Sequence, residues 1–277
     1  MLPDLPPSPP PSLDQVQVQS LSTATGGVSP EVLKEIGPTR AAQLRELAVG
    51  VGARAGLERR SYEIQKTLRE RSRELDAIFN FQSLMLDNNV LPPVLLEAEN
   101  QFQQDSGEAI RLVDKVYRVH AQARFVSAPP NWREYVVRDF TVQGISQDVP
   151  AAMLPSNDKE TAAWKTWVAE GWKAGLSQAE TIHAEGLSRL RRDYEGMVRY
   201  RVLYAKGMVS RPFVARSDFG VTGAAGELNV NETTLRITAM PSFNLNVATW
   251  RGKAEPAAEP QAAKPESARR SLFGGGK

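Results

Sequence analysis

A single helical pattern runs without interruption from the cap residues Asn157 and Asp158 to about Met208. At 1.5 Å per residue such a helix is roughly 75 Å long, so any fold of this chain has to be built along it. Small side chains at helical spacing let another helix or strand approach closely. The face predicted to point inward is mostly small and consists of Trp164, Val168, Gly171, Gly175, Ala179, Ile182, Gly186, Leu190, Tyr194 and Met197.

Two further helical stretches precede this segment. The first begins after Pro38 and places Leu44, Leu47, Ala48 and Val51 at spacings of three and four, and the second runs from Ile64 to Phe79. Between them lie three glycines, Gly50, Gly52 and Gly56. A helix interior normally disfavours glycine, so this region predicts either a kink or a close backbone contact. The spacings Gly52/Gly56 and Gly171/Gly175 lie among charged residues and indicate close packing inside the protein.

Two segments predict β-hairpins. Residues 94–104 and 109–126 are extended candidates joined by the turn composition at 105–108, and 117–125 alternates as a half-buried strand does. Pro129, Pro130 and Asn131 then predict a cap for a short helix through Trp132. Beyond Pro212 we expect strands at 213–215, 228–230 and 233–239, with Asn231-Glu232 as the turn between the last two and Gly220, Gly223 and Gly226 in the preceding loop.

The predicted fold class is therefore α+β: a mainly helical body with two antiparallel β-hairpins and disordered Pro-rich tails. Residues 1–37 are rich in Pro, Ser, Gln and Thr and predict a disordered tether. Residues 38–250 form the predicted α+β domain. Residues 251–277 are rich in Ala, Pro, Glu and Lys and predict a disordered tail.

Composition excludes several classes of site. The chain has no cysteine, which excludes disulfides, thiolate metal sites and a lipid-bearing cysteine in the sequence as given. Two histidines, His120 and His183, disfavour an imidazole-rich metal site. The net charge of +2 disfavours bulk electrostatic capture of nucleic acid. We expect no cofactor and no metal. Nor does the sequence as given begin with a secretory signal pattern.

For each motif that could bind a ligand or take part in catalysis, a purely structural interpretation is better supported than a functional one. The glycines at 220, 223 and 226 resemble a phosphate loop, but a strand follows them where such a loop needs a helix. The basic run at 189–201 is interleaved with acidic residues, as on a solvated helix face, so no specific nucleic-acid binding is expected. No nucleophile with a matching base can be assembled. The sequence predicts a protein that is not an enzyme. An enzyme of unknown chemistry and a DNA-binding transfer protein remain the alternatives.

Several ordered motifs carry more information than composition does. They are Ile78-Phe79-Asn80-Phe81, 84–94 with Asp87-Asn88-Asn89, Ala128-Pro129-Pro130-Asn131-Trp132-Arg133-Glu134-Tyr135, Glu170-Gly171-Trp172, 192–197, Met208-Val209-Ser210-Arg211-Pro212, and 220–238. In this order, from about Pro38 to Asn246, they resemble the DotC family, called TraI in the transfer systems of I-type conjugative plasmids.

The resemblance implies a structural subunit of a type IVB secretion or conjugation apparatus of the Dot/Icm kind. Members are typically outer-membrane lipoproteins that face the periplasm, assemble with DotD and DotH into a core complex, and build the channel through which protein or DNA leaves the cell. It therefore implies DotD-like and DotH-like partners in a ring-forming hetero-oligomer, and no enzymatic activity. The second candidate is a DNA-contacting conjugal transfer accessory protein without enzymatic activity.

Aromatic residues and proline-rich turns within these motifs suggest a partner-binding surface. Such groups are costly to expose and favourable to dock. The interface hypothesis names Phe79, Phe81, Leu91, Pro92, Trp132 and Tyr135, together with Phe213 and Val221 from the final strands. The alternative is that the same residues close this protein's own core, where buried aromatic residues usually lie.

Overall fold

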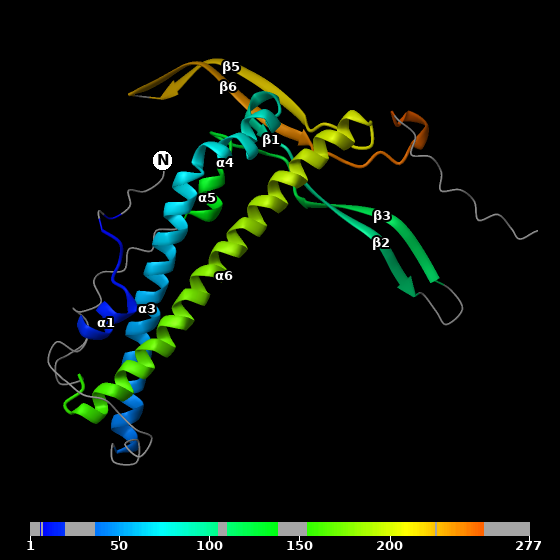
Figure 1. The fold of residues 1–277 in the computed structure, drawn as a ribbon. Helices are drawn as coiled ribbons and strands as arrows, with labels where there is room; N and C mark the ends of the chain where they lie inside the picture. The colour runs from blue at the N-terminus through cyan, green and yellow to red at the C-terminus, as the bar shows by residue number, and fades with distance from the viewer. Residues whose placement is uncertain are drawn as a thin grey trace, which may run out of the picture.

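A computed structural model describes residues 6, 8–19, 37–104, 110–137, 154–224 and 226–251. Its scaffold is a pair of long helices that lie side by side, α3 (Pro38–Glu70) and α6 (Asp158–Ala205) (Figure 1). Helix α6 begins where the sequence predicted, because the Asn157 side chain accepts a hydrogen bond from the Glu160 backbone N–H at 2.8 Å. At 48 residues, it is the long helix that the sequence pattern required.

The two long helices touch backbone to backbone along their glycines. A Cβ added to Gly52 would lie 2.1 Å from the Val168 carbonyl oxygen, and one added to Gly175 would lie 2.1 Å from the Ala53 carbonyl oxygen. The predicted close contact is therefore confirmed. The alternative of a kink is not what the chain adopts, because α3 continues through Gly50–Gly56 and breaks only at Arg71, before α4 (Ser72–Ile78).

A short helix, α1 (Leu13–Gln19), packs against the same pair. Its Val16 is 1% exposed and joins a core cluster with Leu44, Trp164 and Val168. These seven residues differ from the expectation for 1–37, which was a tether without folded structure. The reason is that apolar residues of this segment, Val16 and Leu13, pack against the core between the two long helices. Most of that segment, and nearly all of 251–277, lies outside the described residues.

We call the pair of long helices, α3 and α6, the rod. At the end of the rod where α3 ends, several short elements meet around a second core, and we call this region the junction. They are α4, the 3-10 turns η1 (Phe81–Leu84) and η2 (Asp87–Asn89), the strand pair β1 (Val90–Leu91) and β4 (Arg124–Phe125), and helix α5 (Trp132–Val136). Helix α5 starts at the predicted cap, where Asn131 and Glu134 form a reciprocal capping box. Because all of these elements pack near the C-terminal half of α6, the junction fixes how the hairpins leave the rod.

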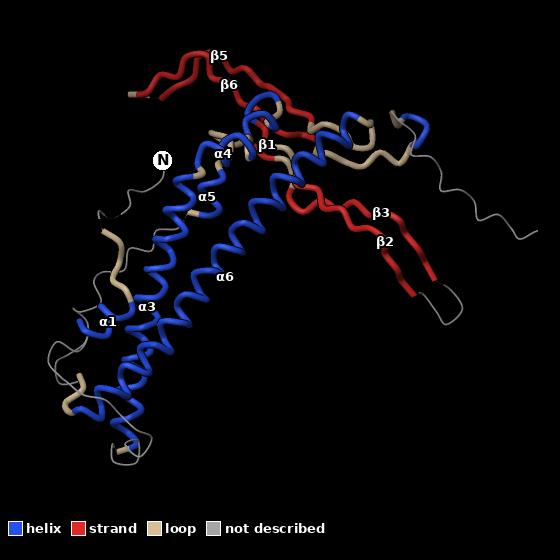
Figure 2. The backbone as a smooth tube through the Cα atoms, viewed as in Figure 1, coloured by secondary structure: helices blue, strands red, loops and turns tan. Residues whose placement is uncertain are grey.

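Two antiparallel hairpins leave the junction in different directions (Figures 1 and 2). One pairs β2 (Val94–Gln104) with β3 (Ile110–Ala121), and the other pairs β5 (Phe213–Ala224) with β6 (Glu227–Ala239). A last turn, η4 (Val247–Thr249), follows. The predicted α+β class, with a helical body and two hairpins, is confirmed. The first hairpin's predicted turn falls on residues outside the described part.

The second hairpin corrects the predicted turn. The last pair of the hairpin is Ala224 with Glu227, so the two strands are not joined at Asn231-Glu232, and Gly220 and Gly223 lie inside β5 rather than in a loop. Asn231 does adopt the left-handed backbone typical of turns, with a φ of 59°, and Gly220 has a φ of 72°. Both lie at a register shift, where β5 and β6 each carry an extra residue. The turn signals therefore mark a bulge within one long hairpin.

Candidate interaction surfaces

Aromatic side chains form the centre of the junction. The Phe81 ring stacks on Tyr135 at 6.0 Å between centroids and meets Tyr194 edge to face at 5.2 Å. Phe79 meets the same Tyr194 ring edge to face at 5.3 Å. Burial raises the pKa of Tyr135 to about 12, with a further contribution from the carboxylate of Asp193. The aromatic rings thus pack the segment after α4, which includes η1, against α5 and α6.

Trp132 is anchored at both its polar and its aromatic parts. Its indole Nε1 donates a hydrogen bond to Asp76 at 2.8 Å, and the Arg133 guanidinium lies 4.4 Å above its ring. Arg133 also donates two hydrogen bonds to Asp76. Hydrogen bonds from Arg133, and then from Trp132, lower the pKa of Asp76 to about 2. Sequence reasoning missed Asp76, because nothing in its spacing signals a partner more than fifty positions away.

The structure divides the eight residues of the interface hypothesis into two groups. Phe81, Leu91, Pro92 and Trp132 are buried, and Phe79 and Tyr135 are half-buried against them. These six close the protein's own core, as the alternative interpretation expected. Phe213 and Val221 are different, because each is 64% exposed. Of the eight, these two leave the largest fraction of their side chains open to a partner.

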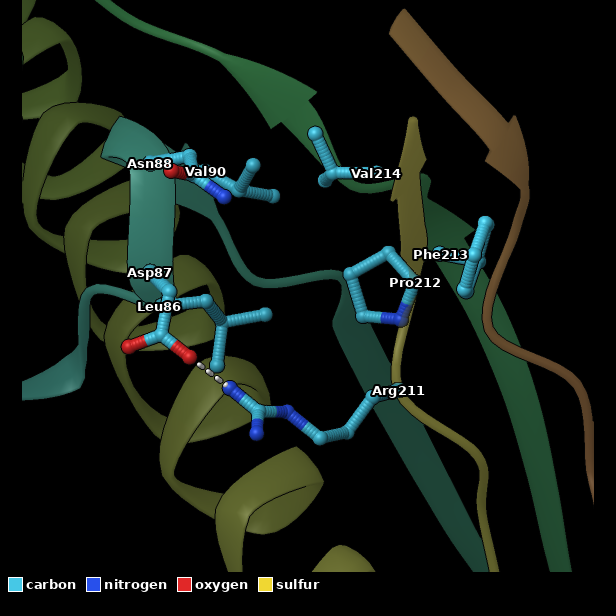
Figure 3. A pocket seen from close by; sticks show the side chains of 8 residues that line it. All are labelled: Leu86, Asp87, Asn88, Val90, Arg211, Pro212, Phe213 and Val214. Carbon is cyan, nitrogen blue, oxygen red and sulfur yellow. Dashed lines mark hydrogen bonds and ion pairs between the residues drawn. The ribbon is translucent and has the colours of Figure 1, made fainter. Parts of the chain in front are cut away.

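A pocket of about 290 Å³ lies where β5 leaves the junction (Figure 3). Its apolar walls come from Leu86, Val90, Pro212, Phe213 and Val214, and its polar walls from Asp87, Asn88 and Arg211. Asp87 and Arg211 form an ion pair at its edge, and Arg211 also lies 5.7 Å from the centre of the Tyr204 ring. That ion pair ties η2 to the root of the hairpin, so the pocket's two charged groups help to position β5.

The outer part of the β5–β6 hairpin exposes an apolar face. Val221 pairs with Val230 and Gly223 with Leu228, so these residues share one face of the ribbon. Val221, Val230 and Leu228 are 64%, 62% and 69% exposed. The neighbouring pair, Thr222 and Asn229, is polar and points to the opposite face. We call the apolar side, made of Val221, Leu228 and Val230, the tip face.

A groove of about 430 Å³ lies between α6 and the β2–β3 hairpin. Apolar side chains of α6 line it, and one of them, Val202, is 46% exposed. At its edge Glu97 accepts hydrogen bonds from Lys115, Tyr117 and Arg199. The bond from Lys115 is the main cause of the lowered pKa of Glu97, and Arg199 adds to it. This network holds the first hairpin at a fixed angle to α6.

The basic run of α6 is largely engaged within the molecule. Arg191 pairs with Glu195 and Arg192 with Asp193, while Arg199 pairs with Glu97 and Arg201 donates to the Ser83 carbonyl. In the residues described, no three His, Asp or Glu side chains are placed to hold a metal ion. In the same part of the chain, no helix is both long enough and apolar enough to cross a membrane.

Comparison with known proteins identifies the family. Residues 38–252 match the family described as type IV secretory system, conjugal DNA-protein transfer. A search of curated proteins finds no match to the chain. The matched residues include both long helices, the junction and both hairpins. The chain therefore belongs to the TraI family of type IV secretory system proteins of conjugal DNA-protein transfer.

Proposed function

We propose that this protein is a structural subunit of the outer-membrane core complex of a type IVB secretion or conjugation apparatus. In this role it assembles with DotD-like and DotH-like subunits, repeated in a ring, to form part of the export channel, and it has no catalytic activity of its own. The family match supports a type IV secretion role. The finer assignment to a DotC-like subunit rests on the ordered motifs between Pro38 and Asn246.

The observation that carries the proposal is the exposed second hairpin. A two-stranded ribbon gains little stability on its own in water, yet β5 and β6 run for 12 and 13 residues away from the core. Several of their large apolar residues remain exposed, including Phe213, Phe219 and Leu228. Large apolar side chains that stay exposed along one ribbon favour a protein interface. A subunit built to be covered by its neighbours explains why such a hairpin exists.

Periplasmic placement at the outer membrane is part of the same proposal and is supported by the resemblance to the DotC family alone. The alternative, direct contact with transferred DNA, has less support. Four of the five arginines in the basic run have partners within the molecule, and two of them, Arg199 and Arg201, bind other segments of the chain.

Affinity purification of the tagged protein from membranes tests the proposal. We expect DotD-like and DotH-like subunits to be recovered with it, and we expect the purified chain to bind duplex DNA only weakly. Recovery without either subunit would contradict the core-complex role. Tight DNA binding that falls steeply with salt would instead support the DNA-contacting alternative, because that slope measures phosphate contacts.

A further inference from the structure

We propose that two copies of this chain pair edge to edge through strand β6, around a two-fold axis at Thr234. The edge concerned is the outer edge of β6, the side of the strand that does not pair with β5. Joining two such edges makes one antiparallel sheet of four strands, with the two β6 strands in the middle and a β5 strand on each side. This pairing goes beyond the proposed place in a core complex and does not rest on it.

The outer edge of β6 is open. Within the described residues β6 pairs with β5 alone, so one side of its backbone has no strand to bond to. Every residue of β6 is exposed except Ile237, which is half-buried. The strand holds neither proline nor lysine, two residues that commonly protect such an edge from pairing. A two-stranded ribbon is marginally stable at best, so the addition of strands at this edge stabilises the hairpin.

The stretch of β6 best suited to pairing lies in the middle of the strand. Residues 233–237 pair one for one with residues 218–214 of β5, without a register shift. Towards the tip, Asn231 ends this regular stretch with its φ of 59°. Strand β5 is less accessible at the corresponding place, because its root, residues 212–214, lines the pocket beside η2. The regular stretch therefore offers its free edge on β6.

The charges of β6 identify a second copy as the partner. Glu232 and Arg236 lie four residues apart and point to the same face of the ribbon. An antiparallel strand that complements them has an acidic residue opposite Arg236 and a basic residue opposite Glu232. Read in its own direction, such a strand has an acidic residue followed four positions later by a basic one. Strand β6 itself has this sequence, so it is complementary to its own copy.

A two-fold axis at Thr234 uses both charges twice. It places Glu232 of each copy opposite Arg236 of the other, and Thr234 opposite Thr234. Opposite charges and threonine pairs directly across antiparallel strands both stabilise a sheet. Arg236 has no ion pair in the part of the chain that the structure describes, and Glu232 accepts a hydrogen bond from the Thr222 hydroxyl. The arginine is thus available to a carboxylate of a second copy.

A contact of this kind joins two chains and then stops. It is isologous, because the same edge serves on both copies, and so it leaves no further copy of that edge to extend the assembly. The pairing also uses the edge of each ribbon and leaves its faces open. The tip face therefore stays accessible to the subunits named in the proposed function.

Single-cysteine variants test the position of the axis, because the chain has no cysteine of its own. Thr234→Cys places a thiol directly opposite its copy, where opposing Cβ atoms lie about 5 Å apart, so mild oxidation with diamide should link the two chains. The matched control is Ser217→Cys, which is also exposed and pairs with Thr234 from β5. In the proposed sheet two such thiols lie three strand spacings apart, about 14 Å, and should not link.

Sedimentation velocity of the full chain tests the charges. Glu232→Arg and Arg236→Glu each place like charges opposite one another, so each variant alone should raise the dissociation constant of the pair about tenfold or more. An equal mixture of the two variants brings opposite charges together again and should pair as the wild type does. The matched control is Glu227→Arg, which makes the same change of charge on β6 outside the regular stretch. All of these side chains are exposed, so the variants should fold, which thermal unfolding verifies.

We expect the wild-type chain and Glu227→Arg to form a species of two chains that does not grow further as concentration rises. A wild type that stays monomeric would overturn the proposal and leave the edge to a different protein. Growth beyond two chains, equal cross-linking of the two cysteine variants, or a mixture of the two charge variants that stays monomeric would overturn it as well. None of these results bears on recovery of DotD-like and DotH-like subunits, so the two proposals fail separately.

Discussion

Glycine sets the distance between the two long helices at the scale of single residues. Gly52 and Gly171 each face a backbone carbonyl of the other helix, those of Val168 and Val49. A side chain that meets a flexible neighbour can push it aside, but a helical carbonyl is held by its own hydrogen bonds. Any Cβ at these positions therefore has to separate the helices themselves.

Gly52→Ala should destabilise the protein by about 2–3 kcal/mol, the upper part of the range for overpacking, because its Cβ would lie 2.1 Å from the Val168 oxygen. Gly50→Ala should act in the opposite direction. Its Cβ meets nothing within 4 Å, so the higher helix propensity of alanine should stabilise α3 by about 0.5–1 kcal/mol. Unfolding in urea measures the change in the free energy of unfolding for each variant. Equal effects at the two positions would contradict the close contact.

Asp76 makes stability depend on pH. Its pKa is lowered to about 2 in the folded protein from an ordinary value of 3.8, so its hydrogen bonds to Arg133 and Trp132 favour the folded state when the carboxyl group is ionised. That stabilisation is present above pH 4 and is lost as pH falls from about 4 towards 2. Asp76→Asn should therefore lower the melting temperature at pH 7 and reduce the loss between pH 4 and 2. If the melting temperature of Asp76→Asn fell between pH 4 and 2 as much as that of the wild type does, the ion pair between Asp76 and Arg133 would contribute nothing to stability.

Individual elements differ in how well the sequence predicts them. Helix α6, helix α5 and the start of β2 at Val94 follow from local signals: a capping asparagine, a capping box and a proline pair. The position of the turn in the second hairpin does not follow from local signals, because Asn231 and Gly220 adopt turn conformations inside a bulge. Helix α1 is missed because its folding depends on Val16 meeting a surface made by residues far along the chain.

Removal of the outer hairpin should leave the rest of the fold intact. Deleting residues 218–233 and joining Ser217 to Thr234 through Asn-Gly keeps the root, where Val214 and Ile237 pack on the core. Because almost all of the deleted residues that the structure describes are exposed, the change in unfolding free energy should stay within about 0.5 kcal/mol. Thermal unfolding of the wild-type chain and of the chain without residues 218–233 gives the difference in their stability. A large fall in stability would show that the hairpin supports the body.

Trp132→Ala, unlike the hairpin deletion, should strongly destabilise the protein. Trp132 is 1% exposed and central to the junction, so its truncation should cost about 3–5 kcal/mol. Loss of assembly in this variant is then expected to follow loss of folding. If Trp132→Ala melted like the wild type but failed to recover partner subunits, the indole would belong to an interface after all, as the sequence hypothesis proposed.

The whole molecule is a rod with two arms, and this arrangement explains why the sequence indicates some surfaces and not others. The aromatic motifs are visible in the sequence, but only the fold shows that Phe81 and Trp132 face inward while Val221 faces solvent. The groove beside Val202 joins α6 to a hairpin that lies about a hundred residues earlier in the chain. No local spacing reveals such a meeting of distant segments.

The central claim is that this protein is an assembly subunit and that it binds its neighbours through the outer part of the β5–β6 hairpin, which its own core does not need. Conjugal transfer frequency, measured in a strain that lacks the chain and is supplied with one variant at a time, tests it most directly. The wild type and Gly50→Ala should restore transfer, and the folded chain without residues 218–233 should not. Normal transfer with the shortened hairpin, or in the strain that lacks the chain altogether, would contradict the claim.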